Sequence, residues 1–349
     1  MLILPVLTVL ITPLVAQQES RARSVTTIDL NGRPQTSFSS GEVRSESGSS
    51  VVETGRSLNG REVPRESVEE RVLRDDASGR VVERIIRRYD TDGRPGPPEK
   101  VRIEEKLDAD GSRHTESSVY RADLNGRLEL SERTRSSASA SGAVETAVER
   151  PTLNGGMEVV EREKTVKRES SGTVESETIV SRRNANGGFS EAVRVRTAAT
   201  KSGDAETSEQ TRWEPDPSGH FVVSGKTVTR TVKNADGSQT EETDVYSLFS
   251  VGRTADANAD QPRLQEQIKK VRRTGDGNTS VETTSIRARL PNDPSRFSDY
   301  ETATTVTVSE TDSSGRAVES SQSAVRRRDI NGGISLQEVR REEISKVKK

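Results

Sequence analysis

The chain lacks cysteine altogether and is poor in aromatic residues. None of its 349 residues is Cys, and only 3% are Phe, Trp or Tyr. The absence of thiols excludes disulfide bonds, thiolate catalysis and cysteine-ligated metal sites. The shortage of rings, together with a hydrophobic content of 29%, leaves too little apolar volume for a conventional two-layer core over this length. We therefore expect a thin structure.

An excess of charge of either sign is also absent. The 54 Lys and Arg residues nearly balance the 56 Asp and Glu residues, and the two signs are interspersed. No basic stripe could replace phosphate counterions, so nucleic acid is not expected as a partner. The low aliphatic content approaches that of disordered chains, but such chains also carry a high net charge. A largely disordered exported chain is kept as a second alternative.

A long apolar run occurs only at the amino terminus. The segment from Met1 to Ala16 is mostly apolar but too short to span a membrane as a helix. We interpret it as a signal peptide that is cleaved after Ala16. The prediction is a secreted, periplasmic or cell-surface protein whose mature chain, 17–349, has no transmembrane segment. The alternative is an incorrectly assigned start in front of an ordinary apolar segment.

What the chain does contain is a recurring turn sequence that ends in Gly. Asp90-Thr91-Asp92-Gly93 is one example. The first side chain can accept a hydrogen bond from the backbone two residues later. The Gly can adopt the left-handed conformation that closes a type I turn with a G1 bulge. Such turns join neighbouring antiparallel strands, so the pattern predicts a series of hairpins.

The turn glycines form two alternating series. The first series is Gly32, Gly60, Gly93, Gly126, Gly155, Gly187, Gly219 and Gly332, and the second is Gly48, Gly79, Gly111, Gly142, Gly172, Gly203, Gly237, Gly277 and Gly315. Consecutive turns of an antiparallel meander lie on opposite edges, so each series should line its own edge. The spacing within the second series defines a two-strand repeat of about 31 residues.

These observations predict an all-β fold. We expect an up-and-down antiparallel meander of about 18 strands, forming a thin single-layer twisted sheet or an open β-solenoid. The β-hairpin repeat domain is expected to cover 17–349 and to be more irregular after 238. Two segments, 261–273 and 335–347, fit either a strand or a helix.

No group of residues in the repeat indicates chemistry. His114 and His220 follow turns without a nucleophile or an orienting acid, so we interpret them as variants of ordinary polar positions. Alternating carboxylates such as Asp90 and Asp92 suggest calcium, but sister turns use Ser or Thr, and turn geometry explains the pattern. We predict no catalytic, cofactor-binding or metal-binding residues, no cofactor and no enzymatic activity.

One turn carries a resemblance to a known family. Tyr89-Asp90-Thr91-Asp92-Gly93-Arg94 resembles the tyrosine-aspartate repeat of bacterial Rhs-type shells, and other turns match it only as Asp-x-x-Gly-Arg. That family has a Tyr-rich, longer repeat wound around a hollow shell, whereas this chain has four Tyr in total. We interpret the likeness as shared turn chemistry.

The expected function is that of an exported, non-catalytic structural or interaction protein of the cell envelope or extracellular space. Unpaired terminal strands would allow the chain to bind itself by strand-edge pairing, although lysines such as Lys346 commonly guard a free edge. The alternative is a repeat module that binds cell-envelope glycan along one turn edge. In that case Trp213 and Phe221, which flank one turn, would form a stacking platform; otherwise they are a cross-hairpin pair.

Overall fold

A computed structural model describes residues 19–346, apart from 30, 46, 57–60, 171, 217, 249–261, 276–277, 291–292, 314 and 329–331. The predicted signal peptide lies outside the described residues. All regular structure in the described part is strand. The strands are β1 (Glu19–Ile28), β2 (Pro34–Ser45), β3 (Gly48–Arg56), β4 (Glu62–Asp76), β5 (Gly79–Arg88), β6 (Glu99–Leu107), β7 (Arg113–Ala122), β8 (Leu128–Ala138), β9 (Val144–Pro151), β10 (Met157–Ser170), β11 (Thr173–Arg183), β12 (Phe189–Ser202), β13 (Ala205–Pro215), β14 (Phe221–Lys233), β15 (Gln239–Ser247), β16 (Arg263–Thr274), β17 (Thr279–Leu290), β18 (Asp293–Thr311), β19 (Ala317–Arg328) and β20 (Ile334–Lys346). None of the described residues forms a helix long and apolar enough to cross a membrane.

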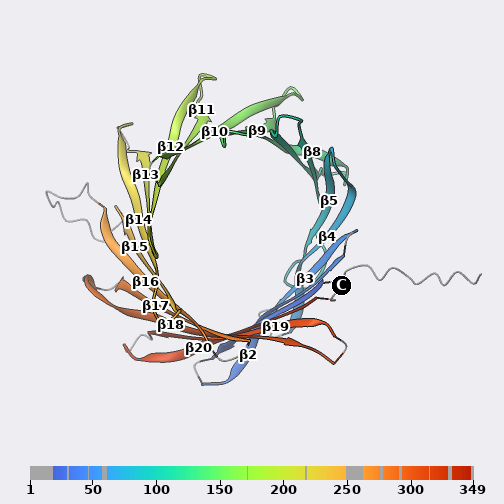
Figure 1. Ribbon diagram of the computed structural model, residues 1–349. Coiled ribbons are helices and arrows are strands. Elements are labelled where there is room, and N and C mark those ends of the chain that lie inside the picture. The colour runs from blue at the N-terminus through green and yellow to red at the C-terminus, as the bar shows by residue number, and fades with distance from the viewer. Residues whose placement is uncertain are drawn as a thin grey trace, which may run out of the picture.

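The meander closes into a barrel. Each strand pairs antiparallel with its neighbours in sequence, and β1 also pairs with β20, from Glu19 opposite Lys346 to Thr27 opposite Glu338. Figure 1 looks along the barrel and shows the strands as a continuous ring around an open centre. The side chains of Lys346 and Glu19 meet across this seam at 3.7 Å. Lys346 therefore binds the first strand and does not guard a free edge.

The prediction of an all-β antiparallel meander is confirmed, but an open sheet or solenoid is wrong. The sheet has 20 strands, against the expected 18 or so. Each hairpin repeat is equally compatible with an open ribbon and a closed ring, because closure depends only on whether the two terminal strands meet. Of the two ambiguous segments, the first is mostly β16 and the second is mostly β20.

The turn chemistry follows the expected pattern at most positions. In the first-series turn at Gly93, the Gly93 amide donates to the Asp90 carbonyl at 3.0 Å, and Gly93 has a φ of 80°. One carboxylate oxygen of Asp90 accepts hydrogen bonds from the amides of Asp92 and Arg94, at 2.9 and 2.8 Å. All the predicted turn glycines have positive φ except Gly60 and Gly277, which lie outside the described residues. Gly48 and Gly79 differ in geometry, because they sit at the start of a strand with φ of 150° and 147°.

β-Bulges recur near the first-series turns, the end of the barrel that we call the first edge. The extra residue of several bulges is a serine whose hydroxyl donates to the backbone carbonyl of the neighbouring strand. These bonds run from Ser37 to Val25 at 3.1 Å, from Ser131 to Val119 at 3.0 Å and from Ser224 to Arg212 at 3.3 Å. Because a bulge bends its strand and increases the twist, this recurring device helps the wall to curve.

The registers divide the side chains into two faces that stay consistent around the ring. On one face Val63, Val193 and Val325 are 7%, 8% and 0% exposed, and on the other face Val43 and Val52 are both 44% exposed. Val81 on the second face, at 6%, and Val174 on the first, at 43%, depart from this trend. A curved wall crowds side chains on its concave surface and spreads them on its convex one. When paired residues are followed from strand to strand in chain order, the pairs lie progressively closer to the first edge. The strands of a barrel coil in a right-handed sense, and for that sense a drift in this direction places the face of Val63, Val193 and Val325 on the inside. We call these the lumen face and the outer face.

Candidate pore lining and outer surface

A ladder of alternating charge lines the lumen across six consecutive strands. Its members are Glu66, Arg88, Glu99, Arg121, Glu132 and Arg150, one each from β4 to β9. The ion pairs are Arg88–Glu66 at 3.1 Å, Arg121–Glu99 at 2.8 Å and Arg150–Glu132 at 3.0 Å. Each arginine lies beside a carboxylate on an adjacent strand because antiparallel partners point to the same side. The wall therefore carries charge while staying locally neutral.

The ladder resumes where the barrel closes. Arg327 on β19 lies between Glu301 on β18 and Glu338 on β20, and the Arg327–Glu338 separation is 3.7 Å. Glu301 and Glu338 are only 15% and 12% exposed at their side chains. Glu342 on β20 then binds both Arg21 and Arg23 of β1. Charge complementarity thus joins the first and last strands.

Between these stretches the lumen face carries hydroxyl pairs together with a further ion pair, Arg182–Glu161 at 2.9 Å. Thr165 and Thr178 are 2.8 Å apart, Thr229 and Thr243 are 3.0 Å apart, and Thr305 donates to Ser323 at 2.9 Å. β-Branched threonine suits a pleated surface, and its hydroxyl finds a partner on the adjacent strand. The hydroxyls are interspersed with larger side chains on the same face, such as Ile268, the partner of Thr243, and Arg340, the partner of Ser323.

The barrel is wide enough to hold water along its axis. Twenty strands about 4.8 Å apart, tilted by about 40°, close into a ring roughly 40 Å across between backbones. Side chains on the lumen face reduce the open width to roughly 25–30 Å. Barrels of 16–18 strands already enclose an aqueous channel. A ring of this size leaves room for water between its described strands.

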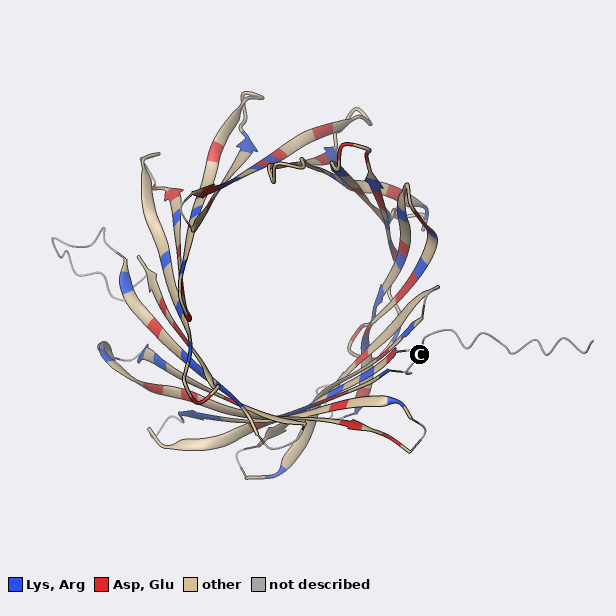
Figure 2. Cartoon of the chain, in the orientation of Figure 1, with Lys and Arg blue, Asp and Glu red and all other residues tan. Residues whose placement is uncertain are grey.

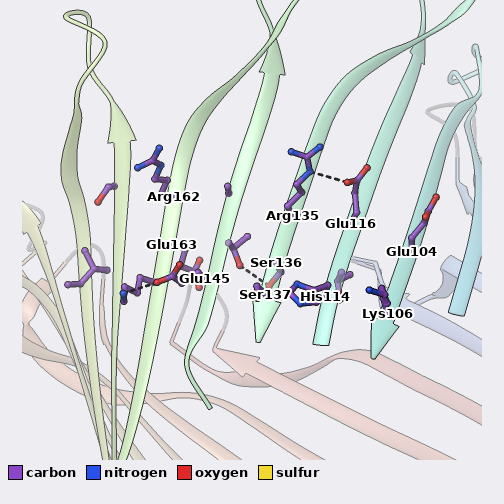
Figure 3. Close-up of a pocket in the computed structure, with 16 residues that line it drawn as sticks. Glu104, Lys106, His114, Glu116, Arg135, Ser136, Ser137, Glu145, Arg162 and Glu163 are labelled. Atoms are coloured by element: carbon purple, nitrogen blue, oxygen red, sulfur yellow. Dashed lines mark hydrogen bonds and ion pairs between the residues drawn. The ribbon is translucent and has the colours of Figure 1, made fainter. Parts of the chain in front are cut away.

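The outer face is also charged over much of its height. Figure 3 shows a shallow hollow across β6 to β11, where side chains of both signs lie in rows. Arg135 binds Glu116 at 3.0 Å and Glu149 at 2.9 Å, and Lys164 binds Glu145 at 2.7 Å. Figure 2 shows that both signs are spread around the whole ring.

Apolar and aromatic side chains gather on the outer face next to the first edge. We call this set the collar: Tyr120, Leu128, Leu130, Phe189, Trp213, Phe221, Tyr246, Leu264, Phe297, Ile334 and Leu336. The collar holds most of the described aromatic residues. Trp213 and Phe221 both belong to it, although their direct partners are Val223 and Pro215. The sequence did not reveal this grouping, because it depends on which side of the closed wall each residue faces.

The histidines lie at turns and contact carboxylates there. His114 Nε2 is 2.9 Å from an oxygen of Asp108, which Lys106 also binds at 2.9 Å. His220 Nδ1 is 3.9 Å from Asp216, and the His220 side chain is 83% exposed. Among the described residues, no group of three or more potential ligands could hold a metal ion. The absence of catalytic and cofactor-binding residues remains a prediction.

Serine neighbours lower the pKa of several turn aspartates at the opposite, second-series end. The Ser238 hydroxyl donates to Asp236 at 2.6 Å and its amide donates at 3.0 Å, and these bonds lower the pKa of Asp236 below its usual 3.8. The Ser78 hydroxyl and amide lower the pKa of Asp76 in the same way. Hydrogen bonds to the charged form favour ionisation.

We therefore expect the barrel to lose stability in acid through these turns. A lowered folded-state pKa adds stability above the unfolded value, here near 3.8, and this contribution disappears as pH falls through the folded pKa. Replacing both residues, Asp76→Asn and Asp236→Asn, keeps an oxygen acceptor but removes the titration. Denaturant midpoints at pH 7, 4 and 3 should fall less steeply for this variant than for the parent chain. Equal slopes would contradict this assignment.

Comparison with known proteins gives structural neighbours only. No protein-family model matches the chain, and no curated protein matches it by sequence. Among solved structures, a mutant of a Rh. blastica porin is 8% identical with a TM-score of 0.43, and Acinetobacter baumannii OccAB3 is 8% identical with a TM-score of 0.45. The outer membrane protein opdK from Pseudomonas aeruginosa is 11% identical with a TM-score of 0.40. The alignments cover 95% of this chain and 98–99% of the others.

These findings overturn the functions expected from an open sheet. The described strands leave no unpaired edge, so self-association by strand-edge pairing is wrong. The structural scaffold and the glycan-binding edge were both expected of an open sheet, and the pairing of β1 with β20 shows a closed barrel instead. We expected no membrane-crossing segment in the mature chain because we considered only helices. This expectation is corrected by the closed barrel, an architecture that satisfies its backbone groups within the wall and so can cross a bilayer.

Proposed function

We propose that the chain forms a wide, water-filled conduit of the cell envelope through which polar solutes pass. The observation that carries this proposal is the closed 20-stranded wall, whose axis is open and whose interior is lined by paired charges and hydroxyls. Barrels of about eight strands are filled by side chains, whereas barrels of 16–18 strands enclose an aqueous channel. The lumen pairs both signs along one ladder, so we expect weak discrimination between small cations and anions.

A conduit that crosses a membrane must have its outer charges neutralised where the wall meets lipid. An unpaired Arg or Lys on the lipid side of a barrel costs about 2–4 kcal/mol at the bilayer midplane. Here Arg135 and Lys164 each hold a carboxylate on a neighbouring strand, which neutralises them in pairs. This pairing lowers the cost of placing the outer face in lipid.

Solute release from vesicles containing the folded protein tests this function. Sugars and short dextrans should leave, while dextrans wider than roughly 30 Å should be retained. Because the chain has no Cys, a single Ser323→Cys on the lumen face can be attached to a thiol-reactive polyethylene glycol, which should sharply reduce release. Ser320→Cys, on the outer face of the same strand, is the matched control and should leave release unchanged. Impermeable vesicles, or equal effects of the two labels, would refute the proposal.

A further inference from the structure

Asparagine followed by glycine occurs only in the turns of the first series. The pairs begin at residues 31, 59, 125, 154, 186 and 331. The glycines of the second series follow Ser or Asp instead, as at Ser141 and Asp110. Closure of the barrel places the described Asn-Gly pairs around one end of the ring, the first edge. That end therefore carries a chemistry that the other end lacks.

An Asn-Gly pair can convert its own asparagine into an acid. The backbone nitrogen of the glycine gives up its proton and attacks the side-chain amide carbon of the asparagine. A carbon–nitrogen bond forms, the bond to the side-chain nitrogen breaks, and ammonia leaves a cyclic imide. Water then opens the imide at either carbonyl and yields aspartate or isoaspartate. Glycine favours the attack because it has no Cβ atom to obstruct the approach or to restrict the backbone, and asparagine is a thermolabile residue.

The asparagine side chains of the described pairs are available for this reaction. Asn31, Asn125, Asn154 and Asn186 are all exposed. Within the residues that the structure describes, their side-chain amides have no hydrogen-bond partner. Neither burial nor bonding therefore holds the reacting carbon away from the glycine nitrogen.

The turn itself opposes the reaction, because it holds the glycine nitrogen elsewhere. The amide of the glycine donates to the carbonyl of the first turn residue, at 3.0 Å both for Gly126 and for Gly155. This bond must open before the nitrogen can attack, so the rate follows the population of the open turn. Side-chain bonds that hold the turn closed lower that population.

The turns differ in these side-chain bonds. One carboxylate oxygen of Asp123 accepts from the amides of Asn125 and Arg127, both at 2.8 Å. The turns that start at Asp29 and Asn184 are capped in the same way. The hydroxyl of Thr152 makes no such bond to the described residues, so the turn that contains Asn154 is closed by backbone bonds alone.

We propose that the first edge modifies itself, and that its Asn-Gly pairs deamidate to aspartate and isoaspartate with Asn154 reacting before the capped asparagines. Each conversion adds a negative charge to the first edge and none to the second. The two ends of the barrel thus become electrostatically unequal as the molecule ages, and the first edge comes to attract cations. The modification depends on the turns alone, so it stands or falls separately from permeation through the lumen.

Peptide mapping by mass spectrometry tests the modification in the folded full chain, incubated at mildly alkaline pH. Asn154 should convert at least about tenfold faster than Asn125, because two hydrogen bonds to the Asp123 carboxylate make the open turn rarer. In the chain unfolded by urea, both asparagines should react at similar rates. Asn234, which precedes Ala235 in a second-series turn, is the matched control and should stay unchanged.

Exchanging the caps separates the effect of the turn from that of the local sequence. Thr152→Asp should slow the conversion of Asn154 by about tenfold, and Asp123→Thr should speed that of Asn125 by a similar factor. In each variant the unaltered turn serves as an internal control and shows that the barrel remains folded. Anion-exchange chromatography should show more acidic species that accumulate in step with conversion. Equal rates at Asn154 and Asn125 in the folded parent, rates unmoved by the exchange, or a folded chain that does not convert would each overturn the proposal.

Discussion

Truncation after Arg328, which removes β20, is expected to abolish the folded barrel. The lost strand contributes nine residue pairs to β1 and twelve to β19. At about 1 kcal/mol per backbone hydrogen bond, this loss exceeds the 5–15 kcal/mol by which a folded protein is usually stable. It also removes Glu342 from Arg21 and Arg23, and it exposes two strand edges. Light scattering should show aggregates, and circular dichroism should show no cooperative unfolding.

A circular permutant is the matched control for this truncation. Glu19 and Lys346 are partners in the native seam, so a short linker can join Lys346 directly to Glu19. New termini can be opened at the exposed turn around Gly126, and a cut at this turn retains all 20 strands. This permutant should keep the oligomeric state of the parent and melt at the same temperature. A truncated chain that did not aggregate and kept its strand content would show that closure does not maintain the fold.

Gly79→Ala is expected to be one of the two most damaging single substitutions at a turn. Gly79 has a φ of 147°, and a Cβ atom added there would lie 2.0 Å from the carbonyl oxygen of Glu105. Because the obstacle is backbone of the adjacent strand, β5 and β6 must separate. We expect a loss of roughly 3 kcal/mol or more in the free energy of unfolding, combining backbone strain with disrupted pairing.

Two other glycines separate the steric effect from the conformational one. Gly126 has a φ of 79° and no atom within 4 Å of an added Cβ, so Gly126→Ala should cost only about 1–2 kcal/mol. Gly48 repeats the crowded geometry, with an added Cβ 2.0 Å from the Glu70 carbonyl oxygen, and Gly48→Ala should resemble Gly79→Ala. Denaturant titrations of the three variants provide the measurement. Similar losses at Gly79 and Gly126 would show that the close approach is relieved at little cost.

Local chemistry was readable from the chain at the turns. The Asp90-to-Gly93 pattern predicted its own capping bonds and its left-handed Gly, because these depend on residues at most four positions apart. The alternation of two turn series likewise predicted that the two series lie on opposite edges, because consecutive turns of a meander are separated by one strand. The exceptions were Gly48 and Gly79, where a neighbouring strand comes too close for any side chain, a contact that the turn sequence alone does not reveal.

The amino-acid sequence by itself determined an antiparallel meander, its thinness and the chemistry of its two ends. These features follow from the glycine turns, from the scarcity of large apolar residues and from the asparagines that precede glycine in one turn series. Only the tertiary structure decided that β1 meets β20, because that pairing joins residues more than 300 positions apart and each repeat fits a ribbon equally well. Closure in turn decided which side chains face the lumen and which form the collar, because inside and outside exist only once the ring is complete.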